Sequence, residues 1–151
     1  MPLVSLIALT VTLTSSIPSS SRAISPSPEL ARAAAVGFIA RLQAKDVVGA
    51  VALCDAPFIT HEQKTLGSIG EVKQYFEAMM AGAPPDRQPN SVIDVKPYAE
   101  TREETAEEVL AVRDPVLKDG GYIVFVGRGG RLGGVLLIRV KDNTARVVGI
   151  G

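Results

Sequence analysis

Apolar residues recur at every fourth position in the first long stretch with a helical pattern. Within residues 28–46 they fall on one helical face, at Leu30, Ala34, Phe38 and Leu42. Pro28 suits the first helical position, because no backbone N–H donor is needed there. Alanines fill much of the same stretch and keep the predicted helix thin. We therefore expect a sheet to approach this face closely.

A second, shorter helix is predicted directly after the first. The stretch "VVGAVALC" follows Asp46, whose carboxylate can accept a hydrogen bond from a free N–H group of the first turn. Pro57 has no N–H group and is expected to end this helix. The following "PFIT" is then a short extended segment in which Phe58 points inward.

Ser68 and Glu71 have the spacing of a capping box, which predicts a third helix over residues 71–80. In this motif each side chain accepts a hydrogen bond from the backbone N–H of the other residue. The helix carries a wide apolar face made of Val72, Tyr75, Phe76, Met79 and Met80. We interpret the two methionines as core filler, because methionine adapts to irregular gaps.

Residues 91–100 alternate between apolar and charged side chains, which predicts a strand with one face in water. Ile93 and Val95 are expected to face the core. Pro97 cannot donate to a neighbouring strand, so the strand should lie at an edge of the sheet or contain a bulge.

Residues 101–115 are predicted to form another helix. Two alternative capping boxes are available at its start, Thr101 with Glu104 and Thr105 with Glu108. Pro115 is expected to end it. The four glutamates of this stretch have helical spacing and indicate a face in contact with water.

The last third of the chain contains three short β-rich runs, "GYIVFVGR", "GGVLLIRV" and "ARVVGIG". Glycine-rich and Lys-Asp-Asn-Thr turns separate them, which predicts a three-stranded antiparallel meander. Its inward positions are predicted to be Ile123, Phe125, Leu136 and Ile138. Helices therefore come first and strands last. This order indicates an α+β fold in which helices pack on one face of a curved antiparallel sheet.

The composition excludes several classes of function. Sixteen basic and sixteen acidic residues give zero formal net charge, and aromatic residues make up 5% of the chain. Because lysine and arginine are scattered, neither nucleic acid nor an anionic membrane surface is an expected partner. The single cysteine, Cys54, cannot form a disulfide within the chain, and we expect its thiol to be buried.

The first residues resemble a secretory signal peptide. The apolar stretch "LVSLIALTVTL" is followed by polar residues and by a small-residue cleavage pattern at Ser21-Arg22-Ala23. We predict a signal peptide at residues 1–23, a short linker at 24–27 and one domain at 28–151, exported to the periplasm or the outside. A cytoplasmic location is the alternative. Stable membrane insertion is not expected, because the apolar run is far shorter than the roughly 20 residues that span a bilayer.

Three stretches together resemble the nuclear transport factor 2-like superfamily, which includes SnoaL-like polyketide cyclases and ketosteroid isomerases. They are "FIARLQAKDVVGAVALCDAPF", "GSIGEVKQYFEAM" and "RVKDNTARVVGIG". The resemblance implies a cystatin-like cone, in which a bent sheet wraps around helices and leaves a pocket at its wide end. It also implies a homodimer. Enzymes, binding modules and assembly domains share this cone, so the fold does not determine the function.

The family's enzymes place an acid or a base on strand positions that face the pocket, and this chain departs from that pattern. Residues 122–140 contain no Asp, Glu or His. His61 is the best catalytic candidate, because imidazole titrates near neutral pH. An isomerase, lyase or cyclase with His61 as general base is therefore the alternative function. An exposed loop position is the simpler interpretation of His61, and one histidine without clustered ligands predicts no metal site.

The preferred prediction is a domain without catalysis that binds a small apolar or weakly anionic ligand, or that dimerises through its sheet. No cofactor is expected. The glycine-rich "GRGGRLGG" does not match a phosphate-binding loop and is interpreted as a hairpin whose Arg128 and Arg131 could attract an anionic ligand. The residues predicted to line the pocket are Phe38, Phe58, Tyr75, Phe76, Tyr98, Phe125 and Leu136.

Overall fold

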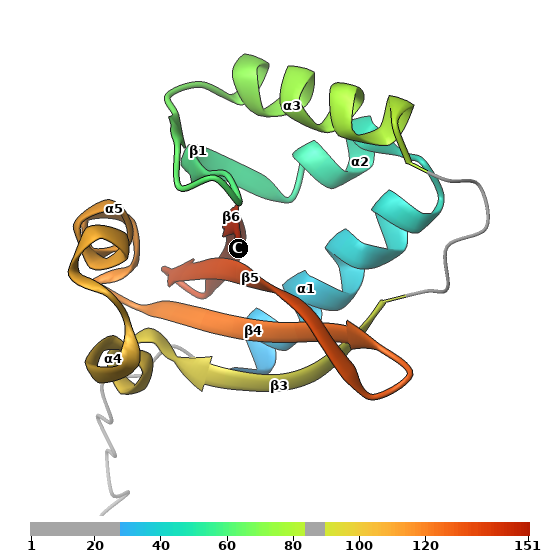
Figure 1. The fold of residues 1–151 in the computed structure, drawn as a ribbon. Coiled ribbons are helices and arrows are strands. Elements are labelled where there is room, and N and C mark those ends of the chain that lie inside the picture. Colours follow the sequence, from blue (N-terminus) through green and yellow to red (C-terminus); the bar gives the residue numbers. More distant parts are fainter. Residues whose placement is uncertain (1–27, 84–89) are drawn as a thin grey trace, which may run out of the picture.

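A six-stranded curved sheet runs through the molecule, and helix α1 lies across one of its faces (Figure 1). The computed structural model describes residues 28–83 and 90–151. Its strands are β1 (Cys54–Ile59), β2 (Thr65–Leu66), β3 (Ser91–Pro97), β4 (Gly121–Arg128), β5 (Arg131–Lys141) and β6 (Thr144–Ile150). They lie in the order β2-β1-β6-β5-β4-β3. All neighbours are antiparallel except β1 and β6, which run parallel.

The helical segments are α1 (Pro28–Gln43), α2 (Val47–Val51), α3 (Ile69–Ala81), α4 (Tyr98–Thr101), the 3-10 turn η1 (Arg102–Glu104) and α5 (Glu107–Leu117). The predicted α+β class with a curved sheet is confirmed, and so is the closing meander of β4, β5 and β6. The predicted signal peptide at 1–23 and linker at 24–27 lie outside the described residues, so export stays a prediction.

Helix α1 packs on the sheet through small residues, as its alanine content suggests. Ala31, Ala35 and Phe38 are fully or almost fully buried, and Leu30 and Leu42 are half-buried beside them. Because an alanine side chain is only a methyl group, the helix axis can lie close to the strands. The predicted apolar face is therefore present, with its centre one residue further along the chain.

Asp46 caps α2 as predicted, since its Oδ1 accepts a hydrogen bond from the N–H of Gly49 at 2.9 Å. The helix does not continue to Pro57, however, and ends at Val51. Its continuation is prevented by the sheet, because the carbonyl of Leu53 accepts a hydrogen bond from the N–H of Val147 in β6. Pro57 instead lies within β1.

The capping box at the start of α3 is confirmed. The N–H of Glu71 donates to Ser68 Oγ at 3.3 Å, and the N–H of Ser68 donates to Glu71 Oε2 at 3.0 Å. Val72 and Phe76 are buried, but Met79 is 37% exposed. The prediction that Met79 fills the core is wrong, because the end of α3 borders a cavity at this position.

Strand β3 lies at the edge of the sheet and also contains a bulge, so both predictions made from Pro97 are confirmed. The bulge falls between Val92 and Asp94 and reverses the alternation of side chains. As a result Val92 and Val95 pack against the core, whereas Ile93 is 43% exposed. The prediction that Ile93 faces the core is wrong.

The stretch predicted as one helix over residues 101–115 is divided into α4, η1 and α5. Neither predicted capping box forms, because Thr101 Oγ1 donates to the carbonyl of Tyr98 and Thr105 Oγ1 donates to the carbonyl of Thr101. Helix α5 begins after Ala106 without a side-chain cap. Pro115 lies inside the helix, which ends two residues later at Leu117.

Helices α4 and α5 cover part of the second face of the sheet, which corrects the prediction that helices lie on one face (Figure 1). A second core forms there from Ile59, Tyr98, Val116, Leu117, Ile123, Leu137 and Val148. Asp114 of α5 ties the two helices together, since it accepts hydrogen bonds from Tyr98 Oη at 2.6 Å and from Arg102 Nη2 at 2.7 Å. The Arg102 guanidinium lowers the pKa of Asp114 below its ordinary value.

The register of the meander decides which of its side chains share a face. Val124 lies opposite Leu136, and Tyr122 lies opposite Ile138, so these four face α1. Ile123 and Phe125 face the second core instead. Leu136 and Ile138 were therefore predicted on the correct face, and Ile123 and Phe125 on the wrong one.

The helices can also be compared with the thickness of a membrane. Within residues 28–83 and 90–151, none of them is both long and apolar enough to cross a bilayer. The longest, α1, has 16 residues and packs against the sheet.

Candidate functional site

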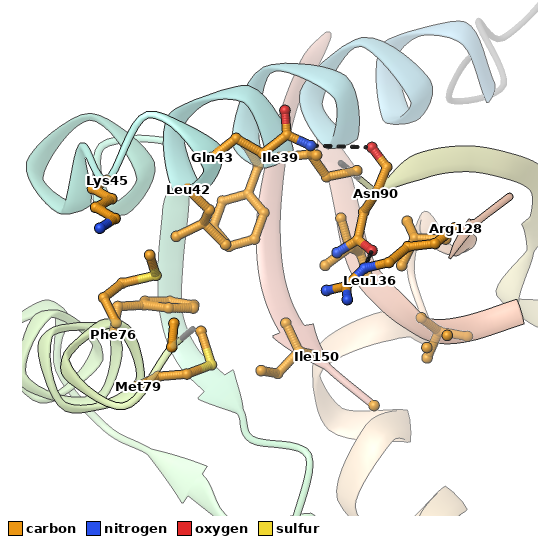
Figure 2. Close-up of a pocket in the computed structure, with 18 of the residues that line it drawn as sticks. Ile39, Leu42, Gln43, Lys45, Phe76, Met79, Asn90, Arg128, Leu136 and Ile150 are labelled. Atoms are coloured by element: carbon orange, nitrogen blue, oxygen red, sulfur yellow. Dashed lines mark hydrogen bonds between the residues drawn. The ribbon is translucent and has the colours of Figure 1, made fainter. Parts of the chain in front are cut away.

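A cavity of about 570 Å³ lies between α1, the end of α3 and the β4–β5 side of the sheet. Figure 2 shows Ile39 and Leu42 of α1 on one wall, Phe76 and Met79 of α3 on another, and Ile150 of β6 below them. Phe38 and Phe76 make an edge-to-face contact at its inner end, with ring centroids 5.5 Å apart. The cavity therefore has mainly apolar walls.

Two glycines of β5 help to create this space. Gly133 and Gly134 both line the cavity, where larger residues would place side chains. A Cβ atom at Gly133 would have no neighbour closer than 3.7 Å, so the wall is open there. The turn between β4 and β5 depends on two other glycines, because Gly129 and Gly130 adopt positive φ angles.

The rim of the cavity is polar and carries two cationic groups. Arg128 Nε donates a hydrogen bond to Asn90 Oδ1 at 2.7 Å, and Gln43 Nε2 donates to the carbonyl of Asn90 at 3.3 Å (Figure 2). Lys45 contributes the second cation from the loop after α1. Among the described lining residues there is no Asp, Glu or His. Among the described residues, the rim thus carries two cations and no carboxylate above apolar walls.

His61 lies in the turn between β1 and β2, away from the residues that line this cavity. Its side chain is 61% exposed, which agrees with an exposed loop position. Nδ1 shares a hydrogen bond of 2.8 Å with Tyr75 Oη, and Nε2 is 4.0 Å from Glu62 Oε1. Burial raises the pKa of Tyr75, so its phenol stays protonated at neutral pH. A histidine–tyrosine pair is therefore present, but on the surface.

Cys54 is buried at the start of β1, where its thiol donates a hydrogen bond to the carbonyl of Ala50 at 3.4 Å. Burial raises the pKa of the thiol to about 12. A thiol that keeps its proton is a poor nucleophile and a poor metal ligand. Across the part of the chain that the structure describes, no three His, Cys, Asp or Glu residues are grouped to hold a metal ion.

Comparisons with models of known protein families and with curated proteins give no match. Among solved structures, one from Thiobacillus denitrificans, provisionally described as a calcium/calmodulin-dependent protein kinase type II association domain, is similar with a TM-score of 0.51. The match covers 83% of this chain and 92% of that chain at 16% identity. The chain has the nuclear transport factor 2-like fold. A nuclear transport factor 2-like protein of unknown function from Pseudomonas putida matches with a TM-score of 0.44 at 11% identity, over 79% of this chain and 80% of that chain.

In this nuclear transport factor 2-like fold, the seven residues predicted to line one pocket lie in four places. Phe38, Phe76 and Leu136 line the cavity between α1, α3 and the sheet. Phe58 is fully buried behind Phe76, with ring centroids 5.5 Å apart.

The other three predicted residues lie away from the large cavity. Tyr75 contacts His61 near the surface. Tyr98 and Phe125 lie on the second face of the sheet, in and beside the second core. Ligand contact by any of the seven stays a prediction.

Several lining residues were not identified from the sequence. Met79 and Met80 were assigned to the core, and Lys45 and Asn90 gave no signal, because each is a single polar residue in a connecting segment. Ile150 was missed because simple alternation places it on the opposite face from Val147, and an irregularity in β6 returns it to the same face. The walls of the cavity therefore depend on contacts between segments that are distant in the sequence.

Proposed function

We propose that this protein binds, without catalysis, a small and mainly apolar ligand that carries one anionic group. The observation that carries the proposal is the combination in one cavity of apolar walls, two cations and no carboxylate among the described lining residues. The fold alone does not distinguish binding modules from enzymes.

The size and surface of the cavity support an apolar ligand body. Its volume of about 570 Å³ lies within the roughly 300–1,000 Å³ of ordinary ligand pockets. Ile39, Leu42, Leu136 and Ile150 offer apolar surface from both the helix and the sheet. Transfer of an apolar group from water to such walls is favourable in proportion to the area buried.

The rim supports an anionic group on the ligand. Arg128 is held by a neutral partner, Asn90, and makes no ion pair with any described residue. A guanidinium can bind a carboxylate through two parallel hydrogen bonds. Lys45 makes no ion pair with any described residue and adds a second cation at the rim.

The alternative function, an isomerase, lyase or cyclase with His61 as general base, has less support. Proton abstraction needs a base within hydrogen-bond reach of the substrate. His61 hydrogen-bonds to Tyr75 on the surface and is not among the described residues that line the cavity.

The test compares binding of the fluorescent fatty-acid probe dansylaminoundecanoate with binding of its methyl ester, by titration of the full chain. Arg128→Gln should weaken binding of the acid roughly tenfold, because a charge-assisted hydrogen bond is lost. Binding of the neutral ester should not change. Arg131→Gln is the matched control, since Arg131 pairs with Arg128 across the hairpin but does not line the cavity.

Two results would contradict the proposal. One is the absence of saturable binding for both forms of the probe. The other is an equal affinity of the acid for the unchanged protein and for Arg128→Gln, which would show that the rim does not recognise the anionic group.

Self-association is a second candidate function. Ile93 and Leu132 are 43% and 63% exposed, and they lie on the strands that flank Gly127 of β4. A Cβ atom at Gly127 would come within 2.6 Å of Ile93 Cδ1, so Ile93 lies directly over this glycine. Exposed apolar side chains at one end of a sheet support a homodimer through that end.

A further inference from the structure

We propose that a second cavity, on the opposite side of the sheet, binds the carboxylate of a small apolar monocarboxylic acid through Arg113. This cavity lies between β3, β4 and β5 on one side and the α4–α5 segment on the other, and has a volume of about 320 Å³. The proposal is independent of the ligand proposed for the larger cavity.

The state of Arg113 is the first observation. Its Nε atom is buried and has no hydrogen-bond partner among the described residues, and its guanidinium makes no ion pair with them. A buried polar atom without a partner is unfavourable, and such atoms are rare in native proteins. Burial also lowers the pKa of Arg113 from its ordinary value, although arginine remains charged at neutral pH. The guanidinium therefore carries a positive charge without a counter-charge among the described residues, and an anion in the cavity would supply one.

Other half-buried or nearby arginines do have partners, which sets Arg113 apart. Arg139 Nη2 donates to Asp55 Oδ2 at 2.7 Å, and Arg102 binds both carboxylate oxygens of Asp114. Asp114 is the acid next to Arg113 in the sequence, but it is already occupied by Arg102 and Tyr98. Asp114 therefore does not act as the counter-charge of Arg113, although the two residues are adjacent in the sequence.

The surroundings of Arg113 favour a small acid with an apolar body. Ile123, Phe125 and Val135 form the apolar floor of the cavity. Lys96 adds a second cation, with its Nζ 5.6 Å from the centre of the Phe125 ring. The floor can bury an aromatic ring or a short alkyl chain while the carboxylate pairs with the guanidinium fork.

Two acidic residues at the same cavity restrict the charge of the ligand. Glu100 and Glu104 line it, but neither forms an ion pair with Arg113 or Lys96. Their two negative charges balance the two cations, so a phosphate or a dicarboxylate would meet repulsion that a single carboxylate largely avoids. Benzoate is small enough to enter a cavity of about 320 Å³.

The test is a titration of the full chain with benzoate, followed by NMR at the Cδ1 methyl group of Ile123. Ile123 lines the second cavity and not the first, so its resonance reports on this site in every variant. We expect a saturable shift with benzoate and none with benzyl alcohol. Arg113→Gln should weaken benzoate binding at least tenfold, and Arg131→Gln, a control on the distant hairpin, should leave it unchanged.

Arg113→Lys keeps the charge and the aliphatic stem, and it should bind benzoate more weakly than the unchanged protein because the two-pronged geometry is lost. It also serves as the test if Arg113→Gln does not fold. The absence of a benzoate shift at Ile123 in the unchanged protein would overturn the proposal, and so would an affinity for benzoate in both Arg113 variants equal to that of the unchanged protein. Arg128→Gln should not alter the shift, so failure at this site and failure at the larger cavity are distinguishable.

Discussion

The thiol of Cys54 lies directly behind helix α2, and its chemistry follows from its surroundings. Burial is the main reason that its pKa is raised to about 12, and the nearby positive charge of Arg146 opposes this only in part. The side chain is almost completely covered, with 6% of its surface exposed. Cys54 therefore acts as a small apolar residue of the core.

We expect Cys54 in the folded protein to react with Ellman's reagent at pH 8 far more slowly than a free cysteine. A pKa of about 12 in place of 9.0 makes the thiolate population roughly a thousandfold smaller. The reaction is followed by absorbance, with the urea-unfolded chain as the control. Rapid reaction of one thiol in the folded state would contradict this expectation.

The raised pKa of Cys54 also makes the free energy of unfolding depend on pH. Above pH 9 an unfolded chain releases the Cys54 proton, whereas the folded chain keeps it until about pH 12. The folded state therefore loses stability as the pH rises through this interval. Replacement by alanine removes this contribution, so the stability of Cys54→Ala should fall less steeply with pH than that of the unchanged protein.

The roles of single residues were predicted correctly where neighbouring residues in the sequence determine them. Asp46 caps the next turn of chain, and Phe58 follows a proline into an extended segment. Ile93 was not, because the bulge beside it depends on how β3 pairs with β4, and no local pattern specifies that pairing.

At the scale of the element, the N-terminal cap of α3 helps to position the residues near the end of α3 that line the large cavity. The capping box at Ser68 and Glu71 fixes where the helix begins. The start of the helix in turn sets the direction in which Phe76 and Met79 point. Because the helix lies beside the cavity for its last turns, its start affects the site from a distance.

Ser68→Ala should lower the free energy of unfolding by about 1 kcal/mol, because the N–H of Glu71 loses its acceptor. The change is measured by urea denaturation of the full chain. Ser91→Ala, at the exposed start of β3, is the matched control and should have little effect. Equal stability of both variants would show that the cap does not hold the helix start.

The segment from α4 to α5 illustrates why an element can be misread from its sequence. Its threonines have the spacing of capping boxes, but their hydroxyls donate to backbone carbonyls instead. Tyr98 is 2% exposed and Asp114 binds it from another helix, so tertiary contacts set the boundaries here. Contacts of that kind have no signature within a short window of sequence.

At the scale of the whole molecule, the two faces of the sheet are covered unequally. One is covered by α1 together with α2 and α3, and the other is covered by α4 and α5 at one end. Ile93 and Leu132 lie towards the opposite end, near the hairpin between β4 and β5. These exposed residues are the basis of the self-association proposed above.

A double variant, Ile93→Lys with Leu132→Lys, should shift the protein from dimer to monomer. Two positive charges at a self-associating surface repel their copies on the partner and are costly to bury. Light scattering during size-exclusion chromatography measures the mass directly. Val48→Lys is the control, since Val48 is 69% exposed on α2. A monomeric unchanged protein, or a dimeric double variant, would contradict this prediction.

The α+β class and the closing meander could be predicted from the sequence, whereas the composition of the cavities could not. Helix and strand periods are local, so the α+β class followed from them. Cavity walls depend on which side of a strand faces which helix, and a shift of one residue exchanges the two faces. Phe125 was assigned to one cavity for this reason and lines the other.

Strand β6 comes last among the described strands in the sequence, but it lies third across the sheet, between β1 and β5. The ribosome synthesises a chain from the N-terminus to the C-terminus, so β1 emerges long before its parallel partner β6. Until then β2 is the only described strand available to pair with β1, whose other edge keeps unpaired N–H and C=O groups. β3, β4 and β5 can pair earlier because they follow one another. The six-stranded sheet therefore cannot be completed until β6 has emerged and paired with both β1 and β5.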